Sequence, residues 1–162
     1  MCEFIINIAS TILGGILLTL ILFLLNEYVF RKKNFTGEWD VELTTHQTDY
    51  KKYQHMKLYY RVHILQKGNE LTGSGEKLKE ILSDGKEMTY SEKSTVAING
   101  YYERKYLGKS RIYLSLIEKG AKREYRTFYV LEISNKSKLK GEFSSTAANS
   151  KGEVTLIRHN NF

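Results

Sequence analysis

The chain has no proline, one cysteine and one tryptophan among its 162 residues. The lone Cys2 excludes a framework of internal disulfides and agrees with a reducing environment around most of the chain. The four histidines show no spacing typical of a metal site. The sequence also lacks a glycine-rich phosphate loop opening a helix and a Gly-x-Ser-x-Gly nucleophile motif. We therefore expect a protein that is not an enzyme and that needs no metal or other cofactor.

One stretch has no charged residue: it begins at Phe4, ends at Leu25 and is 22 residues long. At about 1.5 Å of rise per residue, a helix of this length covers roughly the hydrocarbon core of a bilayer. Residues 34–162 contain no second stretch of this kind. We predict that residues 1–33 form a transmembrane anchor with a basic juxtamembrane segment, and that residues 34–162 form a separate water-facing domain.

The charges that flank the span are asymmetric. Glu3 is the only charge before it, whereas three consecutive basic residues, 31–33, follow it. By the positive-inside rule, the chain crosses the membrane once and residues 34–162 lie in the cytoplasm. The alternative is a secretory signal peptide. It fits less well because no basic segment precedes the span, the apolar stretch is too long and no small-x-small cleavage site follows.

Small residues lie close together within the span. Ser10 and Gly14 are four positions apart, and Gly15 follows directly. This spacing lets two membrane helices approach closely, which favours self-association. The alternative is that glycine is simply frequent in membrane helices.

Beyond the anchor, apolar and polar residues alternate, as at Met56, Leu58 and Tyr60. A period of two with one apolar face is typical of half-buried antiparallel strands. Short loops between such strands favour an all-β, eight-stranded antiparallel up-and-down barrel behind the transmembrane helix, a fold that removes open sheet edges. Residues 78–93 are ambiguous: a long loop with a short helix, or an extra strand. The predicted strands are 37–46, 55–66, 69–77, 94–104, 109–118, 123–133, 138–145 and 152–158.

In such a barrel the first strand starts at the rim where the last one ends. Trp39 and Arg158 would then be inward-facing neighbours, and the guanidinium would stack on the indole and close that end. The opposite rim would be open. Arg123 lies near that rim at the start of its strand. The inward positions closest to it are Thr45, Tyr60, Lys77, Tyr125, Thr127 and Ser145.

Residues 35–39, Phe-Thr-Gly-Glu-Trp, together with Arg158 in the last strand, resemble the lipocalin-like barrel pattern. Combined with an N-terminal anchor, a basic linker and a barrel of about 125 residues, the chain resembles the transmembrane β-barrel effectors of bacterial CBASS anti-phage systems. That resemblance implies a cytoplasmic barrel that senses a cyclic oligonucleotide made by a CD-NTase. Ligand binding promotes homo-oligomerisation and disrupts the inner membrane. The family usually has two spans, whereas this chain has one, and no ligand-binding motif is matched.

A cyclic oligonucleotide requires cations for its phosphates and aromatic faces for its bases. Under this hypothesis Tyr60 and Tyr125 stack on bases, and Lys77 and Arg123 contact phosphates. The alternative is that inward tyrosines are core, because small barrels are usually filled by their own side chains.

Three functions remain open on the sequence alone. The first is a membrane-anchored effector that binds a cyclic oligonucleotide and acts on the lipid bilayer. The second is a membrane-tethered, lipocalin-like binder of an apolar small molecule. The third is a structural or interaction barrel without a ligand. The net charge of +7 could attract anionic headgroups, a nucleotide or RNA, although we expect no DNA or RNA polymer as a partner.

Overall fold

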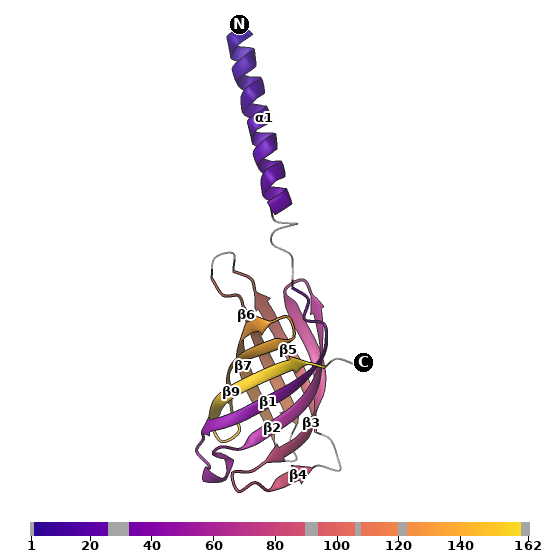
Figure 1. Cartoon of the computed structure of the whole chain (residues 1–162), viewed down its shortest axis with the longest axis vertical. Coiled ribbons are helices and arrows are strands. Elements are labelled where there is room, and N and C mark those ends of the chain that lie inside the picture. Colours follow the sequence, from indigo (N-terminus) through magenta and orange to yellow (C-terminus); the bar gives the residue numbers. More distant parts are fainter. Residues whose placement is uncertain (1, 26–32, 90–93, 106–107, 120–122, 160–162) are drawn as a thin grey trace. The chain divides into compact units, whose positions relative to one another are not determined.

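The structure is a computed structural model that describes residues 2–25, 33–89, 94–105, 108–119 and 123–159 (Figure 1). The chain divides into two compact units, residues 1–34 and residues 35–162, and each is described by itself. Three basic residues follow the predicted span, and two of them, Arg31 and Lys32, lie outside the described residues.

In its described residues, the first unit contains one helix, α1, Cys2–Leu24. Its span Glu3–Leu24 has a mean hydropathy of 2.3, and none of it is buried. The hydroxyls of Thr11 and Thr19 each donate to the carbonyl four residues earlier, at 2.8 Å, so these polar groups need no partner from outside the helix. This confirms one helix that is long and apolar enough to cross a membrane.

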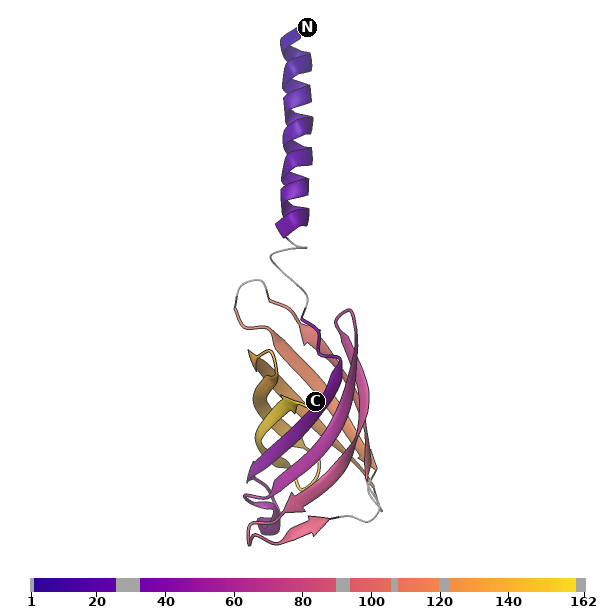
Figure 2. The ribbon, with the colours of Figure 1, turned by 45° about the vertical axis from the view of Figure 1, so that its right-hand side comes forward.

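The second unit is a closed antiparallel barrel (Figures 1 and 2). Eight strands pair in the order β2-β1-β9-β8-β7-β6-β5-β3, and β3 pairs with β2 to close the ring. The predicted fold class is therefore confirmed. The strands are β1 Gly37–Gln47, β2 Lys57–Lys67, β3 Glu70–Ile81, β4 Glu87–Thr89, β5 Thr95–Glu103, β6 Arg111–Lys119, β7 Glu124–Asn135, β8 Lys138–Ser145 and β9 Ser150–Arg158.

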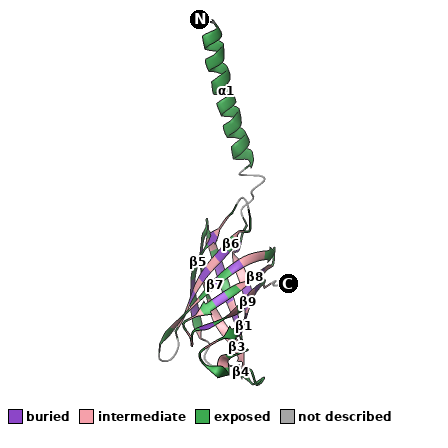
Figure 3. Cartoon of the chain, turned by 90° about the vertical axis from the view of Figure 1, so that its left-hand side faces the viewer, coloured by how far each residue is buried: buried purple, intermediate pink, exposed green. Residues whose placement is uncertain are grey.

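The alternating sequence pattern forms the barrel's core. On β6, Ile112, Leu114 and Leu116 are buried, whereas their neighbours face outward (Figure 3). A similar alternation recurs on β1, β2, β5, β7, β8 and β9, because successive side chains of a strand point to opposite faces. Burial of one face of these strands favours closure of the sheet into a barrel.

The structure describes residues 78–89 of the segment 78–93, which was ambiguous in the sequence. β3 continues to Ile81, a turn follows, and β4 pairs with the end of β3 alone. No helix occurs in the described residues of this segment, so the extra-strand alternative is correct there. One further element was not predicted: a 3-10 helix, Lys51–Tyr53, in the β1–β2 connection.

One rim of the barrel, called here the Trp39 rim, is filled by side chains. Trp39 is fully buried, and its indole N–H donates to the Phe35 carbonyl at 2.9 Å. Trp39 and Arg158 are partners in the β1–β9 register, and the guanidinium carbon lies 4.9 Å from the indole centroid. Arg158 therefore stacks on Trp39 at this end of the barrel, as predicted from the sequence.

Candidate functional site

The opposite rim, called here the Thr45 rim, holds a cavity of about 380 Å³. This volume lies at the lower end of the range for small-molecule sites. All seven residues that the sequence placed at an open rim line the cavity: Thr45, Tyr60, Lys77, Arg123, Tyr125, Thr127 and Ser145.

Strand register explains why these residues meet. Tyr60 on β2 is paired with Lys77 on β3, and Thr127 on β7 is paired with Ser145 on β8. The hydroxyls of the second pair lie 2.9 Å apart. Side chains at inward positions of neighbouring strands therefore form adjacent parts of one wall.

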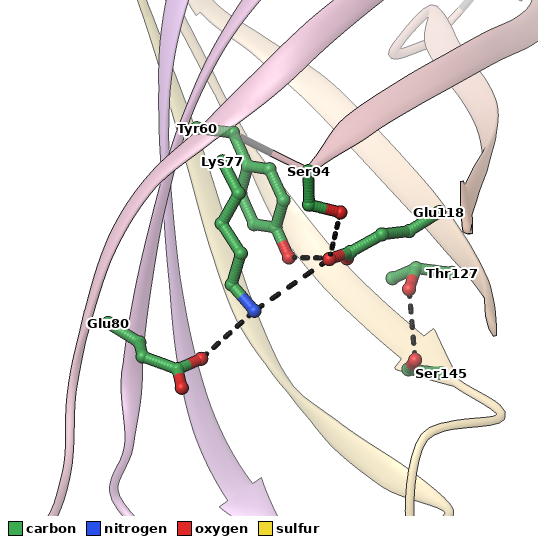
Figure 4. A network of polar contacts seen from close by, with 7 residues as sticks. All are labelled: Tyr60, Lys77, Glu80, Ser94, Glu118, Thr127 and Ser145. Carbon is green, nitrogen blue, oxygen red and sulfur yellow. Dashed lines mark hydrogen bonds and ion pairs between the residues drawn. The ribbon is translucent and has the colours of Figure 1, made fainter. Parts of the chain in front are cut away.

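An ionic network occupies one side of the cavity (Figure 4). The Lys77 ammonium lies 2.9 Å from a Glu80 oxygen and 3.8 Å from a Glu118 oxygen, with side-chain exposures of 14%, 12% and 20%. Glu118 also accepts from the Tyr60 hydroxyl at 3.1 Å and from the Ser94 hydroxyl at 2.9 Å. Burial, and then the nearby Glu118 charge, raise the pKa of Tyr60 well above its ordinary value, so the phenol remains a neutral donor.

Neither carboxylate of this network was predicted from the sequence. Glu118 continues the inward series of Ile112, Leu114 and Leu116 on β6, so the alternation could have identified it. Glu80 follows the opposite parity to Lys77. The β2–β3 register shifts between Tyr59 and Tyr60, and such a bulge turns the following residues to the other face.

Aromatic side chains lie around the cavity's mouth. The guanidinium carbon of Arg123 is 5.0 Å from the ring centroid of Tyr125. Tyr50 and Tyr53 also line the cavity, in edge-to-face contact at 5.0 Å. They belong to the β1–β2 connection, which alternation does not describe, and were therefore missed.

The lining is mixed in charge. Lys77 and Arg123 contribute two positive charges, and Glu80 and Glu118 two negative ones. Hydroxyls and aromatic rings supply further polar and stacking groups. Among the described residues, no group of three or more His, Cys, Asp or Glu side chains could hold a metal ion. The arrangement suits non-covalent binding of a small molecule with both acceptor and donor groups.

Comparison with known proteins reveals no family. No family model matches the chain, and no curated protein matches it. Among solved structures, a de novo designed fluorescence-activating β-barrel is similar over 78% of this chain and 94% of its own, with 13% identity and a TM-score of 0.48. A redesigned β-barrel bound to DFHBI is similar over 76% of this chain and 94% of its own, with 13% identity and a TM-score of 0.49.

Proposed function

We propose that this protein is a membrane-anchored effector whose barrel binds a cyclic oligonucleotide in the cavity at the Thr45 rim. The observation that carries the proposal is the mixture of groups in that cavity. The Arg123–Tyr125 pair offers a cation beside an aromatic face at 5.0 Å, which matches a phosphate next to a base.

The two carboxylates select among anionic ligands. Lys77 already has two carboxylate neighbours, so a simple phosphate gains little there and meets repulsion from Glu80 and Glu118. A nucleotide differs because the amino groups of its bases donate hydrogen bonds, which carboxylates accept. A nucleotide bound with its bases toward the two carboxylates and its phosphates toward Arg123 would therefore match both the acidic and the basic groups of the cavity.

The membrane part of the proposal rests on α1 and on the resemblance to CBASS effectors. The span lies in the bacterial inner membrane, and the barrel lies in the cytoplasm, as the charges around the span indicate. Ligand binding promotes homo-oligomerisation, and the assembled spans disrupt the membrane, which kills the infected cell before phage mature.

The ligand test is thermal unfolding of the full-length protein in detergent micelles with a panel of cyclic di- and trinucleotides. At about 100 times its dissociation constant, a ligand stabilises by roughly 2.7 kcal/mol, which raises Tm by about 10 °C for a barrel of about 130 residues. Arg123→Ala should remove the shift. Arg126→Ala, on the outer face of β7, should retain it. No shift with any nucleotide would contradict the proposal.

A second candidate function is binding of an apolar small molecule. It is favoured by the apolar side of the same cavity, formed by Leu43, Met56, Leu58 and Phe143. This candidate predicts stabilisation by an apolar ligand that Arg123→Ala leaves unchanged, so the same variant separates the two functions.

The membrane test replaces Leu18, in the middle of the span, with arginine. Arginine at the centre of a membrane helix costs about 2.5–3.5 kcal/mol on insertion scales. We expect Leu18→Arg to abolish cell killing while the barrel keeps its Tm. A variant recovered in the soluble fraction that still kills would refute a membrane mechanism.

A further inference from the structure

The three chain connections at the Trp39 rim are strongly basic. Because neighbouring strands run antiparallel, the β2–β3, β5–β6 and β7–β8 connections lie at the end of the barrel where β1 begins (Figure 2). Stretches 67–70, 103–111 and 134–138 contain seven lysines and arginines but only two acidic residues. The connecting stretches at the Thr45 rim contain eight lysines and arginines and five acidic residues. These stretches are residues 47–57, 81–95, 119–124 and 145–150.

Local ion pairs leave part of this positive charge available. Glu132 lies 2.8 Å from Lys109 and 3.8 Å from Arg111, and Glu103 lies 3.7 Å from Lys105, so three of the seven basic side chains are paired. In the part of the chain that the structure describes, Lys67, Lys136 and Lys138 form no ion pair. Lys67 and Lys136 are also exposed. Their charge can act on a partner outside the barrel.

Exposed apolar side chains lie just below these connections on the outer wall. Leu65 on β2 and Tyr101 on β5 are each 52% exposed, and Ile157 on β9 is 49% exposed. Each lies within two residues of the end of its strand. Cations together with aromatic and apolar side chains at one level are typical of surfaces that rest in the interfacial region of a membrane.

We propose that the Trp39 rim binds the surface of an anionic membrane through Lys67, Lys136 and Lys138, with Tyr101 at the headgroup level. The bilayer is the favoured partner because α1 is long and apolar enough to span a membrane. Residues 25–34 join α1 to Phe35 and reach at most about 35 Å when extended. A linker of this length allows the rim to reach lipid headgroups. The proposal is independent of what the cavity binds.

The test uses the full-length protein in nanodiscs of phosphatidylcholine alone, or of phosphatidylcholine and phosphatidylglycerol in equal parts. Hydrogen exchange is measured at stretches 67–70 and 134–138, with 146–149 of the opposite rim as the internal reference. On anionic nanodiscs we expect severalfold slower exchange at the first two stretches and no change at the reference. High salt should remove the difference, because it screens exposed charges.

Two charge-matched variants complete the design. Lys67→Glu/Lys136→Glu/Lys138→Glu should lose the protection, whereas Lys51→Glu/Lys52→Glu/Lys151→Glu, at the Thr45 rim, should keep it. Both are compared at unchanged Tm. Equal exchange on the two nanodisc types would overturn the proposal. Equal protection by an RNA oligonucleotide in detergent without anionic lipid would also overturn it, by assigning the rim to nucleic acid.

Discussion

Replacing Lys77 with methionine should strongly destabilise the barrel. Lys77 lies between Glu80 and Glu118, and the three side chains are only 12–20% exposed. Removing one partner of a buried ion pair costs about 3–5 kcal/mol, because the remaining charge stays desolvated without compensation. Since these side chains retain some exposure, we expect about 3 kcal/mol, which lowers Tm by roughly 11 °C for a barrel of this size.

Lys79→Met is the matched control. Lys79 is two positions further along β3 and pairs with Glu87 at 3.1 Å, but its side chain is 38% exposed and that of Glu87 is 49% exposed. An exposed ion pair contributes about 0–1 kcal/mol. The control should therefore shift Tm by less than about 4 °C.

The assay is thermal unfolding of the full-length variants in the same detergent. A third variant, Lys77→Met/Glu80→Gln/Glu118→Gln, removes all three charges. Glutamine at position 118 can still accept from the hydroxyls of Tyr60 and Ser94. We expect this variant to recover most of the lost stability. Equal losses for Lys77→Met and Lys79→Met, or no recovery in the triple variant, would refute the account of a desolvated ionic network.

Two further predictions concern the barrel wall. A Cβ at Gly141 would lie far inside van der Waals contact of a carbonyl oxygen on β7, so Gly141→Ala should cost at least about 1–3 kcal/mol and lower the midpoint of urea unfolding; an unchanged midpoint would contradict this. Burial raises the pKa of Asp40, but hydrogen bonds and charges from Arg61 and His159 outweigh it and hold that pKa below 3.8. Asp40 therefore stabilises the fold above its unfolded pKa of about 3.9 and loses this contribution as pH falls through the lowered value. Asp40→Asn should lower Tm at pH near 7, and the Tm values of variant and parent should converge at acid pH. A Tm difference that stays constant across this range would contradict the linkage.

The fold and the cavity wall were largely predictable because the barrel has simple connectivity. When every strand is followed by its neighbour, residue parity decides which side chains face inward, and strand direction decides which rim they approach. Thr45, Tyr125 and Ser145 could be placed in this way from the sequence alone, and all three line the cavity.

The missed residues lie where parity fails or does not apply. The bulge in the β2–β3 pairing turns Glu80 inward. β4 pairs only with the end of β3 and is not one of the eight strands of the closed ring. No buried face imposes an alternation of apolar and polar residues on it. The sequence of residues 78–93 therefore shows no regular period. Tyr50 and Tyr53 are positioned by a loop, whose conformation depends on hydrogen bonds such as Asp49 N–H to the Ala148 carbonyl at 2.9 Å.

The pairing of β1 with β9 limits when the barrel can close during synthesis. β1 follows soon after α1 in the chain, but its second neighbour, β9, is synthesised about 100 residues later. At about 5–20 residues per second, translation from the end of α1 to Arg158 takes on the order of ten seconds. Under the proposed function, α1 can therefore reach the membrane before the ring closes, and each molecule would be inserted before its cavity can bind a ligand.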